Sequence, residues 1–168
     1  MAVIEGRVHS LNVKPKVTGE RGLPKQAVPS AEITANGLAG DFNRYRTEAK
    51  GGTPNMAVLI MPLETLHEIQ ADGWPVEPGH IGENITTIGI GYADLPPGTR
   101  VRIGEADLEI TEACQPCANL RLLPYVGRAR VTEFIRAMIG RRGWYARVIR
   151  PGPVQNGDVI LVSAEDVQ

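Results

Sequence analysis

Two cysteines, Cys114 and Cys117, are the most reactive side chains in the sequence, and only Gln115 and Pro116 separate them. A thiolate is a nucleophile, a redox group and a soft metal ligand, so this spacing is compatible with several kinds of chemistry. The two residues lie too close together to crosslink distant parts of the chain, and a reducing compartment would keep both as thiols. We therefore expect a role in chemistry or in simple packing.

Three chemical roles are open for this segment. A dithiol redox pair needs its first cysteine at a helix N-terminus, early in a βαβ unit, whereas this segment follows an expected antiparallel hairpin. Half of a zinc site needs two further ligands, and His9, His67 and His80 are scattered along the chain. The third role is a single nucleophilic or metal-ligating thiolate at Cys117, with Cys114 as a resolving neighbour. Two small buried side chains are the non-chemical alternative.

Positive charge is concentrated just after these cysteines. Residues 121–150 contain eight arginines, one acidic residue (Glu133) and no lysine, although the whole chain has a formal charge of -1. Such a segment is either solvated surface or an anion site, because the guanidinium fork suits phosphate. The rest of the chain is acidic overall, so a small anionic ligand fits better than a polyanion, and we do not expect nucleic acid as a partner.

Two glycine-containing loops are further candidates for a binding site. The segment 37–41 includes Gly40 and Asp41, and the segment 78–84 includes Gly82, Glu83 and Asn84. Glycine permits a tight turn or the close approach of a ligand. A carboxylate and an amide ahead of an expected strand at 85–88 can cap backbone groups or contact a polar ligand. For Asn84 we expect capping ahead of ligand contact.

Short apolar runs between glycines and prolines predict the strands that position these residues. Runs at 3–11 and 56–61 read as strands, and 101–103 and 108–110 flank a turn at 104–106 as a hairpin. A second hairpin is expected between 144–149 and 159–162, with Asn156-Gly157 supplying the positive backbone angles of its turn.

Two helices are expected. The first runs from about Pro62 to Asp72 and is stopped by Gly73. The second begins with Thr132 as its N-cap and ends at Gly140. Its expected buried face consists of Phe134, Ile135, Met138 and Ile139.

Length and composition favour one domain over residues 1–168. The chain has a mass of 18.2 kDa and 42% hydrophobic residues, enough to bury a core without disulfides. Strands outnumber helices and do not alternate with them, so we predict a mainly β protein with peripheral helices, organised as a mostly antiparallel barrel. The longest apolar run, 56–63, is far shorter than the roughly 20 residues of a membrane helix. The charged N-terminus does not resemble a signal peptide, so we expect a cytoplasmic protein without a membrane partner.

Taken in order, these segments resemble the MOSC domain, the family named for the C-terminal domain of molybdenum cofactor sulfurases. The similarity spans residues 37–158, within a motif-bearing core of about 37–162. It is strongest at Gly-Glu-Asn (82–84) and at Pro116-Cys117, where the family's most characteristic cysteine falls on Cys117. The other matching residues are Gly37-Leu-Ala-Gly-Asp41, Gly51-Gly52, Ala57-Val58, Glu64, Pro78-Gly79, Leu95, Gly98, Ile103-Gly104, Leu120 and Gly157-Asp158.

The resemblance implies a β-barrel-rich fold and a cysteine that ligates the molybdenum of the pterin cofactor or carries sulfur destined for it. Cys117 is accordingly the expected catalytic residue and metal ligand, and Cys114 a possible resolving thiol. From the local charge we add that arginines after Cys117 would meet the anionic cofactor's phosphate. The expected cofactor-binding residues are Gly40, Asp41, Gly82, Glu83, Asn84, Asn119, Arg121, Arg128 and Arg130.

One departure from the family pattern concerns the paired glycines. Many members have a histidine just before them and an acidic residue shortly after, whereas this chain has Ala49-Lys50 and Thr53-Pro54-Asn55. Full-length sulfurases also carry a pyridoxal-phosphate domain, for which this chain has no counterpart, so we do not expect pyridoxal phosphate to bind.

The leading hypothesis is a molybdenum-cofactor protein in which Cys117 ligates the metal. It would reduce N-hydroxylated or N-oxide-type compounds with electrons from a separate protein, or hold the cofactor during maturation. The alternatives are persulfide transfer from Cys117, supplied by a cysteine desulfurase, a non-catalytic cofactor carrier, and a dithiol oxidoreductase that uses Cys114 and Cys117.

Overall fold

The structure is a computed structural model and describes residues 2–19 and 21–164. In this part of the chain the strands are β1 (Val3–Val13), β2 (Gln26–Val28), β3 (Ser30–Thr34), β4 (Gly37–Leu38), β5 (Val58–Pro62), β6 (Ile85–Ile88), β7 (Arg100–Ile103), β8 (Ala106–Ala113), β9 (Trp144–Arg150), β10 (Gly152–Gln155) and β11 (Val159–Ser163). The α-helices are α1 (Arg44–Ala49), α2 (Leu63–Ala71) and α3 (Gly127–Met138). Short 3-10 helices are η1 (Pro54–Met56), η2 (Tyr92–Asp94) and η3 (Ala118–Leu122).

Strands among the described residues close into a seven-stranded barrel in the order β1, β6, β5, β9, β8, β7, β11 and back to β1. The barrel is mixed, because β5 and β6 are parallel while the other neighbours in it are antiparallel. A parallel pair needs a crossover, and α2 lies in the connection from β5 to β6. The predicted mainly β barrel with peripheral helices is therefore confirmed.

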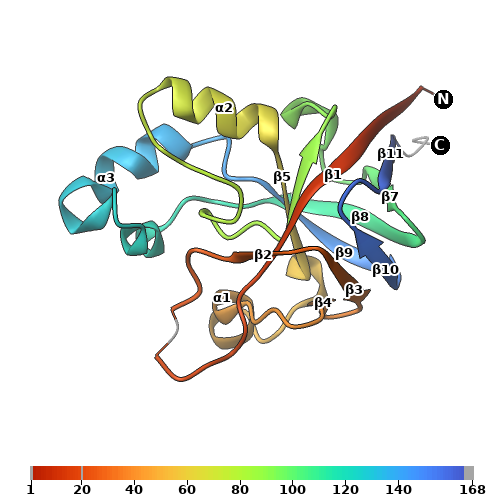
Figure 1. The fold of residues 1–168 in the computed structure, drawn as a ribbon, viewed down its shortest axis with the longest axis horizontal. Coiled ribbons are helices and arrows are strands. Elements are labelled where there is room, and N and C mark those ends of the chain that lie inside the picture. The colour runs from red at the N-terminus through yellow and green to blue at the C-terminus, as the bar shows by residue number, and fades with distance from the viewer. Residues whose placement is uncertain (1, 20, 165–168) are drawn as a thin grey trace.

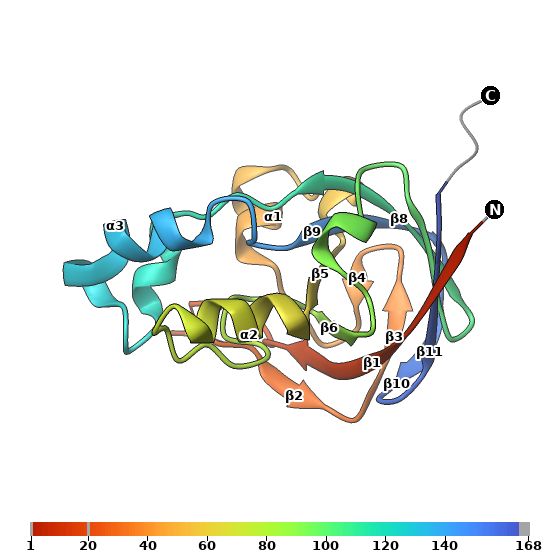
Figure 2. The same cartoon turned by 90° about the horizontal axis from the view of Figure 1, so that it is seen from above.

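The remaining elements lie around the barrel. β2 pairs with the end of β1, and β10, β3 and β4 form a small antiparallel sheet. Both ribbon views place α3 at the end of the molecule opposite the start of β1 and the end of β11, with α1 to one side (Figures 1 and 2). The structure thus has a barrel end and a helical end.

Each end has its own apolar core. The barrel interior is filled by branched side chains that alternate along the strands, such as Val101 and Ile103 of β7. The second core lies beneath α2 and α3, where the rings of Trp74 and Phe134 are 4.7 Å apart between centroids. Met61, at the end of β5, is fully buried in this second core and so links the two ends.

Several sequence expectations are confirmed. The hairpin about residues 104–106 is formed by β7 and β8, with Gly104 at a φ of +56°. The first helix is α2, preceded by Pro62 and followed by Gly73 at a φ of +99°. These features depend on local sequence signals, namely a turn glycine, a proline at a helix start and a glycine at its end.

The predicted start of the second helix is wrong, and its predicted buried face is confirmed except at Ile139: Phe134 and Met138 are buried, and Ile135 packs against the same core. α3 begins at Gly127, so Thr132 lies inside it, and Ile139 is 65% exposed because the helix ends at Met138 and the backbone turns outward. The side chain of Val126, at the N-cap position, is buried in the helical core, as are Phe134 and Met138. Packing of this earlier turn outweighs the weaker preference of threonine for an N-cap.

The predicted hairpin between 144–149 and 159–162 is also wrong. β9 pairs with β5 and β8, whereas β11 pairs with β1 and β7. β10 lies between them in sequence and pairs with β3. Asn156-Gly157 turns the chain from β10 into β11, and only Gly157 has a positive φ. A turn signal is local, but the partner of each strand is chosen by long-range packing.

Candidate functional site

A cavity of about 970 Å³ opens between the helical end and the barrel. Its wall includes Gly19 and residues from the segment 21–25, the start of α1 with the residues just before it, and the segment 112–122 that leaves β8. This volume is at the upper end of the range for small-molecule sites, about 300 to 1,000 Å³. The cavity is therefore large enough for a cofactor-sized ligand.

Both cysteines line this cavity but differ in exposure. Cys114 is 6% exposed, packs with Met56, Leu59 and Tyr145, and its backbone N–H donates to the carbonyl of Gly143 at 2.9 Å. Cys117 is exposed and lies at the N-cap position of η3, where its carbonyl accepts a hydrogen bond from the N–H of Leu120. Cys117 is thus the thiol that a ligand can reach, and Cys114 is held in the wall.

The polar part of the cavity wall is mainly cationic. The charged residues that line it are Arg21, Lys25, Arg44, Lys50, Glu112, Arg121 and Arg142. This excess of positive charge favours an anionic ligand. Apolar groups form the rest of the wall, including Phe42, Tyr45, Met56, Leu59 and Leu122.

A buried arginine fixes the loop that bears Lys50. Arg46 of α1 is 7% exposed, and its guanidinium donates to the carbonyls of Asn36, Gly52 and Thr53 at 2.7, 3.0 and 2.6 Å. The paired glycines at 51 and 52 both have positive φ, +63° and +74°, which lets the loop turn its carbonyls toward this guanidinium. Burial of Arg46 lowers its pKa from the ordinary value, and three acceptors keep the group satisfied.

Beneath the cavity, three buried side chains form a closed set that we name the Asp41 cluster: Lys25, Asp41 and Asn84. Asp41 Oδ2 accepts from Lys25 Nζ at 2.7 Å and from Asn84 Nδ2 at 2.9 Å, and its Oδ1 accepts from the N–H of Lys14 at 2.8 Å. The side chains of Lys25 and Asp41 are only 5% and 6% exposed. Asn84 Oδ1 accepts from the N–H of Leu59 on β5 at 3.0 Å, which confirms its expected capping role. The cluster ties three distant segments together.

Next to this cluster lie two further buried polar side chains, Glu83 and Arg142, which interact electrostatically and which we name the Glu83–Arg142 pair. Glu83 is fully buried; its Oε1 accepts from the N–H of Gly79, and its Oε2 has no hydrogen-bond partner among the described residues. Burial raises the pKa of Glu83 to about 8, although the Gly79 N–H, Arg142 and Lys25 each lower it. Arg142 is 6% exposed and lines the cavity, and neither its Nε nor its Nη1 has a partner in the described part of the chain.

Glycines bring the Glu83 loop against Lys25. Gly79 has a φ of +88°, and a Cβ placed on it would lie 2.6 Å from the carbonyl oxygen of Lys25. Its own carbonyl accepts from the N–H of Lys25 at 2.8 Å. Only glycine permits this approach, so the loop that carries Glu83 is fixed beside the cavity wall.

The neighbours of Arg142 hold it in place. Arg141 bonds to Asp72 and to the carbonyl of Ala137, and a Cβ on Gly143 would lie 2.9 Å from the carbonyl oxygen of Ile60. Tyr92 Oη also accepts from the N–H of Gly143 at 3.1 Å. These contacts fix the backbone on both sides of Arg142, and the side chain itself is held by burial, at 6% exposure.

The structure separates the expected site residues into two sets. Cys114, Cys117, Gly82, Asn119 and Arg121 line the cavity. The residues that lie outside its lining are Gly40, Asp41, Glu83, Asn84, Arg128 and Arg130.

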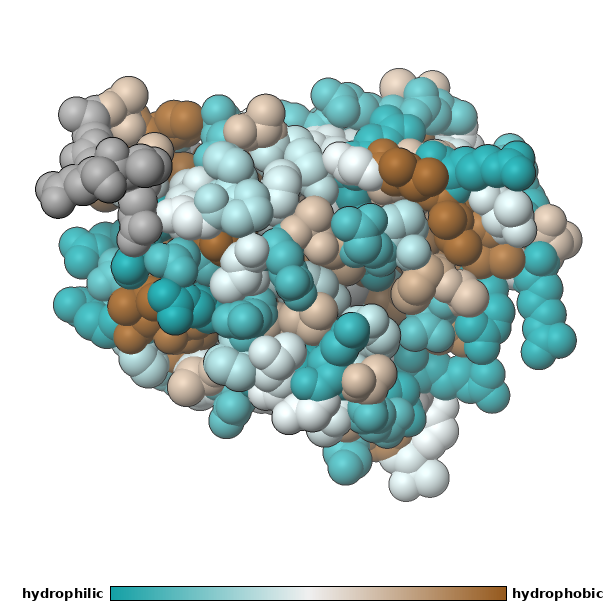
Figure 3. All heavy atoms as spheres, turned by 180° about the vertical axis from the view of Figure 1, so that it is seen from behind, coloured by the Kyte–Doolittle hydropathy of each residue, from teal (hydrophilic) through white to brown (hydrophobic). Residues whose placement is uncertain are grey.

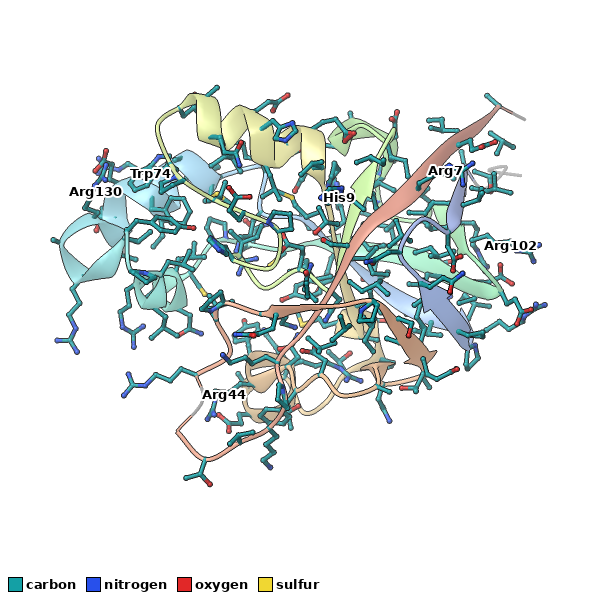
Figure 4. The ribbon with its side chains drawn as sticks, in the orientation of Figure 1. Arg7, His9, Arg44, Trp74, Arg102 and Arg130 are labelled. Carbon is teal, nitrogen blue, oxygen red and sulfur yellow. The ribbon has the colours of Figure 1, made fainter. Side chains whose placement is uncertain are left out.

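Arg130 shows why local charge is a weak guide to this cavity. It lies 4.2 Å over the ring of Trp74 and is paired with Glu133 on the outer side of α3 (Figure 4). Arg128 is exposed on the same helix. Seen from behind, long hydrophilic side chains project from the α3 end of the molecule (Figure 3).

Several cavity residues were not singled out from the sequence. Arg142 belongs to the arginine-rich segment but carries no motif that separates it from its seven neighbours. Arg21, Lys25, Arg44 and Lys50 come from the first third of the chain, and only the fold brings them to Cys117. No spacing in the sequence predicts that these four cations lie near Cys117.

The described residues contain no group of three or more histidine, cysteine, aspartate or glutamate side chains placed to hold a metal ion. A metal in this cavity would therefore need donors from its own ligand in addition to the protein. In the same part of the chain, no helix has the length and apolarity needed to cross a bilayer.

A family model described as the MOSC domain matches residues 47–161, more than half of the chain. The chain belongs to the MOSC domain family. This family is linked to the molybdenum cofactor, and the β-barrel agrees with the resemblance seen in the sequence. No curated protein matches the chain.

Solved structures share the MOSC fold at low sequence identity. YuaD from Bacillus subtilis superposes with a TM-score of 0.82 at 22% identity, over 98% of this chain and 99% of that one. YiiM from Geobacillus stearothermophilus gives 0.73 at 23% identity, over 96% and 77%. YiiM from Escherichia coli gives 0.65 at 22% identity, over 96% and 72%. At these identities the likeness concerns the fold.

Proposed function

We propose that this MOSC domain binds the molybdenum cofactor in the cavity beside η3, with Cys117 as a ligand of the metal. The observation that carries the proposal is an exposed thiol and a buried, unpaired guanidinium, Arg142, on the wall of one large cavity. A thiolate is a soft ligand suited to metals that take sulfur donors. A guanidinium without a partner suits a phosphate.

The residues present fit such a group. A pterin cofactor would bring its own sulfur donors, so one protein thiolate completes the set and no cluster of protein ligands is required. Arg142 and the surrounding cations would hold its phosphate, and apolar wall residues such as Leu59 and Leu122 would contact its less polar parts. Arg121, whose Nη1 donates to the carbonyl of Ala118 at 2.9 Å, adds positive charge near Cys117.

We further propose that the bound protein reduces N-hydroxylated or N-oxide-type compounds with electrons from a separate protein. When bound, the cofactor supplies two-electron redox chemistry at the metal. The protein would contribute the thiolate of Cys117, the cationic part of the wall to hold the anion, and apolar wall residues to contact the substrate. Storage or delivery of the cofactor would use the same residues without turnover.

A second function is favoured by the difference in exposure between the two cysteines. The exposed Cys117 thiolate could attack the outer sulfur of a persulfide on a cysteine desulfurase, so that the S–S bond of the desulfurase breaks, its thiolate leaves and Cys117 becomes a persulfide; Cys114 lies three residues away in the same wall. Mass spectrometry after incubation with a desulfurase and cysteine tests this function, because it would show one added sulfur on Cys117. An unchanged mass would count against sulfur transfer.

The decisive experiment for cofactor binding measures molybdenum per chain by elemental mass spectrometry, with protein made in cells that produce the cofactor. We expect molybdenum in the wild type and its loss in Cys117→Ala. Cys114→Ala is the matched control, because Cys114 lines the same cavity but is buried, and it should keep its molybdenum. Equal molybdenum content in Cys117→Ala and the wild type would refute the ligand assignment.

A further inference from the structure

We infer, on the basis of the anion site proposed above, that Glu83 is a positioning residue that sets the anion affinity of Arg142: a neutral Glu83 leaves the guanidinium available to the ligand, and an ionised Glu83 competes for it. Glu83 does not line the cavity, so it acts through Arg142 and not by touching the ligand.

The geometry places unsatisfied hydrogen-bonding capacity on both sides of this pair. Within the described part of the chain, Glu83 Oε2 has no hydrogen-bond partner and neither do Arg142 Nε and Nη1, although both residues are more than nine-tenths buried. Buried donors and acceptors in folded proteins are otherwise nearly always paired. Either the ionised carboxylate of Glu83 or an anionic ligand could therefore pair with the guanidinium of Arg142, and the two would compete.

Charged and titratable groups face Glu83 from several elements. Lys25 ahead of β2, Arg142 between α3 and β9, and Tyr125 between η3 and α3 each interact electrostatically with it. Burial and the charges of Glu83 and Glu77 raise the pKa of the Tyr125 phenol, whose hydroxyl lies 3.1 Å from His80 Nδ1, so this group stays neutral. Lys25 is already engaged by Asp41 at 2.7 Å. Of these two cations near Glu83, Arg142 is therefore the one without an ion-pair partner in the described part of the chain.

The charge balance of the buried groups gives the direction of the effect. Lys25, Asp41 and Arg142 carry a net charge of +1 while Glu83 is neutral, which favours an anion in the cavity. Ionisation of Glu83 cancels this charge. Because the pKa of Glu83 is raised to about 8, neutral Glu83 prevails near neutral pH and is lost as the pH rises above that value.

Sulfate is a suitable probe because its charge does not change over this pH range. If sulfate binds only when Glu83 is neutral, its apparent Kd in the wild type should rise about tenfold between pH 7 and pH 9, from linkage with a group of pKa about 8. In Glu83→Gln, which keeps an oxygen acceptor for the Gly79 N–H, the Kd should be nearly constant over the same range. Glu133→Gln, an exposed substitution on α3, should keep the wild-type pH dependence.

A second measurement needs no variant and so does not depend on Glu83→Gln folding. Calorimetry of sulfate binding at about pH 9, in two buffers with different ionisation enthalpies, should show uptake of nearly one proton per sulfate by the wild type. At about pH 7 the uptake should be close to zero, since Glu83 is already protonated.

The outcomes separate the two proposals. Sulfate binding with a flat pH profile, or with the same slope in Glu83→Gln, would overturn the role of Glu83 and leave the anion site intact. The absence of sulfate binding at every pH would overturn the anion site of Arg142, and with it the basis of this inference. A tenfold rise that disappears in Glu83→Gln, together with proton uptake at high pH, would support both.

Discussion

Two neighbouring sets of buried polar side chains differ in whether their hydrogen-bonding atoms have partners. In the Asp41 cluster, a lysine, a carboxylate and an amide satisfy one another and bind the backbone of Lys14 and Leu59. In the Glu83–Arg142 pair, one carboxylate oxygen of Glu83 and two guanidinium nitrogens of Arg142 have no hydrogen-bond partner among residues 2–19 and 21–164. Asn84 and Glu83 are adjacent in sequence, yet the first closes a structural network and the second belongs to an open one.

This difference suggests different roles: the Asp41 cluster stabilises the fold, and Arg142 belongs to the proposed binding site. A closed buried network fixes the relative positions of the segments that it joins. A buried guanidinium without a partner costs free energy, and in the proposed function an anionic ligand would supply that partner. The sequence predicts cofactor binding for Asp41, Glu83 and Asn84 alike, and the structure shows that their hydrogen bonding differs: Asp41 and Asn84 bond to each other, whereas Glu83 Oε2 has no partner among the described residues.

The largest effect is expected from opening the closed cluster. Asp41→Ala should lower the free energy of unfolding by about 3–5 kcal/mol, because it leaves the buried Lys25 ammonium without its counter-ion. Urea denaturation monitored by circular dichroism measures this change. Glu48→Ala is a useful control, since its carboxylate is exposed and pairs only on the surface of α1 with Arg44. A loss below about 1 kcal/mol in Asp41→Ala would mean that the cluster is not structural.

A smaller effect, on binding and not on folding, is expected from removing the open guanidinium. Arg142→Met should weaken sulfate binding near pH 7 by between about tenfold and a hundredfold, the value of a hydrogen-bonded charge. Its free energy of unfolding should stay within about 1 kcal/mol of the wild type or rise, because a buried cation gives way to an apolar side chain.

The comparison variant for this experiment is Arg147→Met. Arg147 is exposed on the barrel and paired with Glu109, away from the cavity lining. It should bind sulfate like the wild type. Similar losses of affinity in both variants would show that overall charge, and not the position of Arg142, governs binding.

The smallest effect is expected on the outer side of α3. The double variant Arg128→Ala/Arg130→Ala should change sulfate affinity by less than about twofold, since exposed charges are screened by salt and neither residue lines the cavity. Isothermal titration at physiological ionic strength provides the measurement. A loss of sulfate affinity as large as that of Arg142→Met would show that Arg128 and Arg130 belong to the ligand site after all.

Local signals in the sequence predicted a good part of the fold. The β7–β8 hairpin and α2 follow from turn glycines, a proline at a helix start and apolar runs, all of which act within a few residues. The start of α3 and the partners of β9 and β11 did not follow, because they depend on packing between distant segments. Barrel closure between β1 and β11 joins the first and last strands, which no local pattern reports.

The sequence by itself determined the chemistry that this MOSC domain can offer. It supplied a pair of closely spaced cysteines, an arginine-rich segment and glycine loops, together with the order of motifs that marks the family. The tertiary structure decided which of these groups meet. It exposed Cys117, buried Cys114, turned Arg128 and Arg130 outward, and left Arg142 unpaired on the cavity wall. Residue type sets the reactivity of a group, but burial and available partners are fixed by segments far away in the chain.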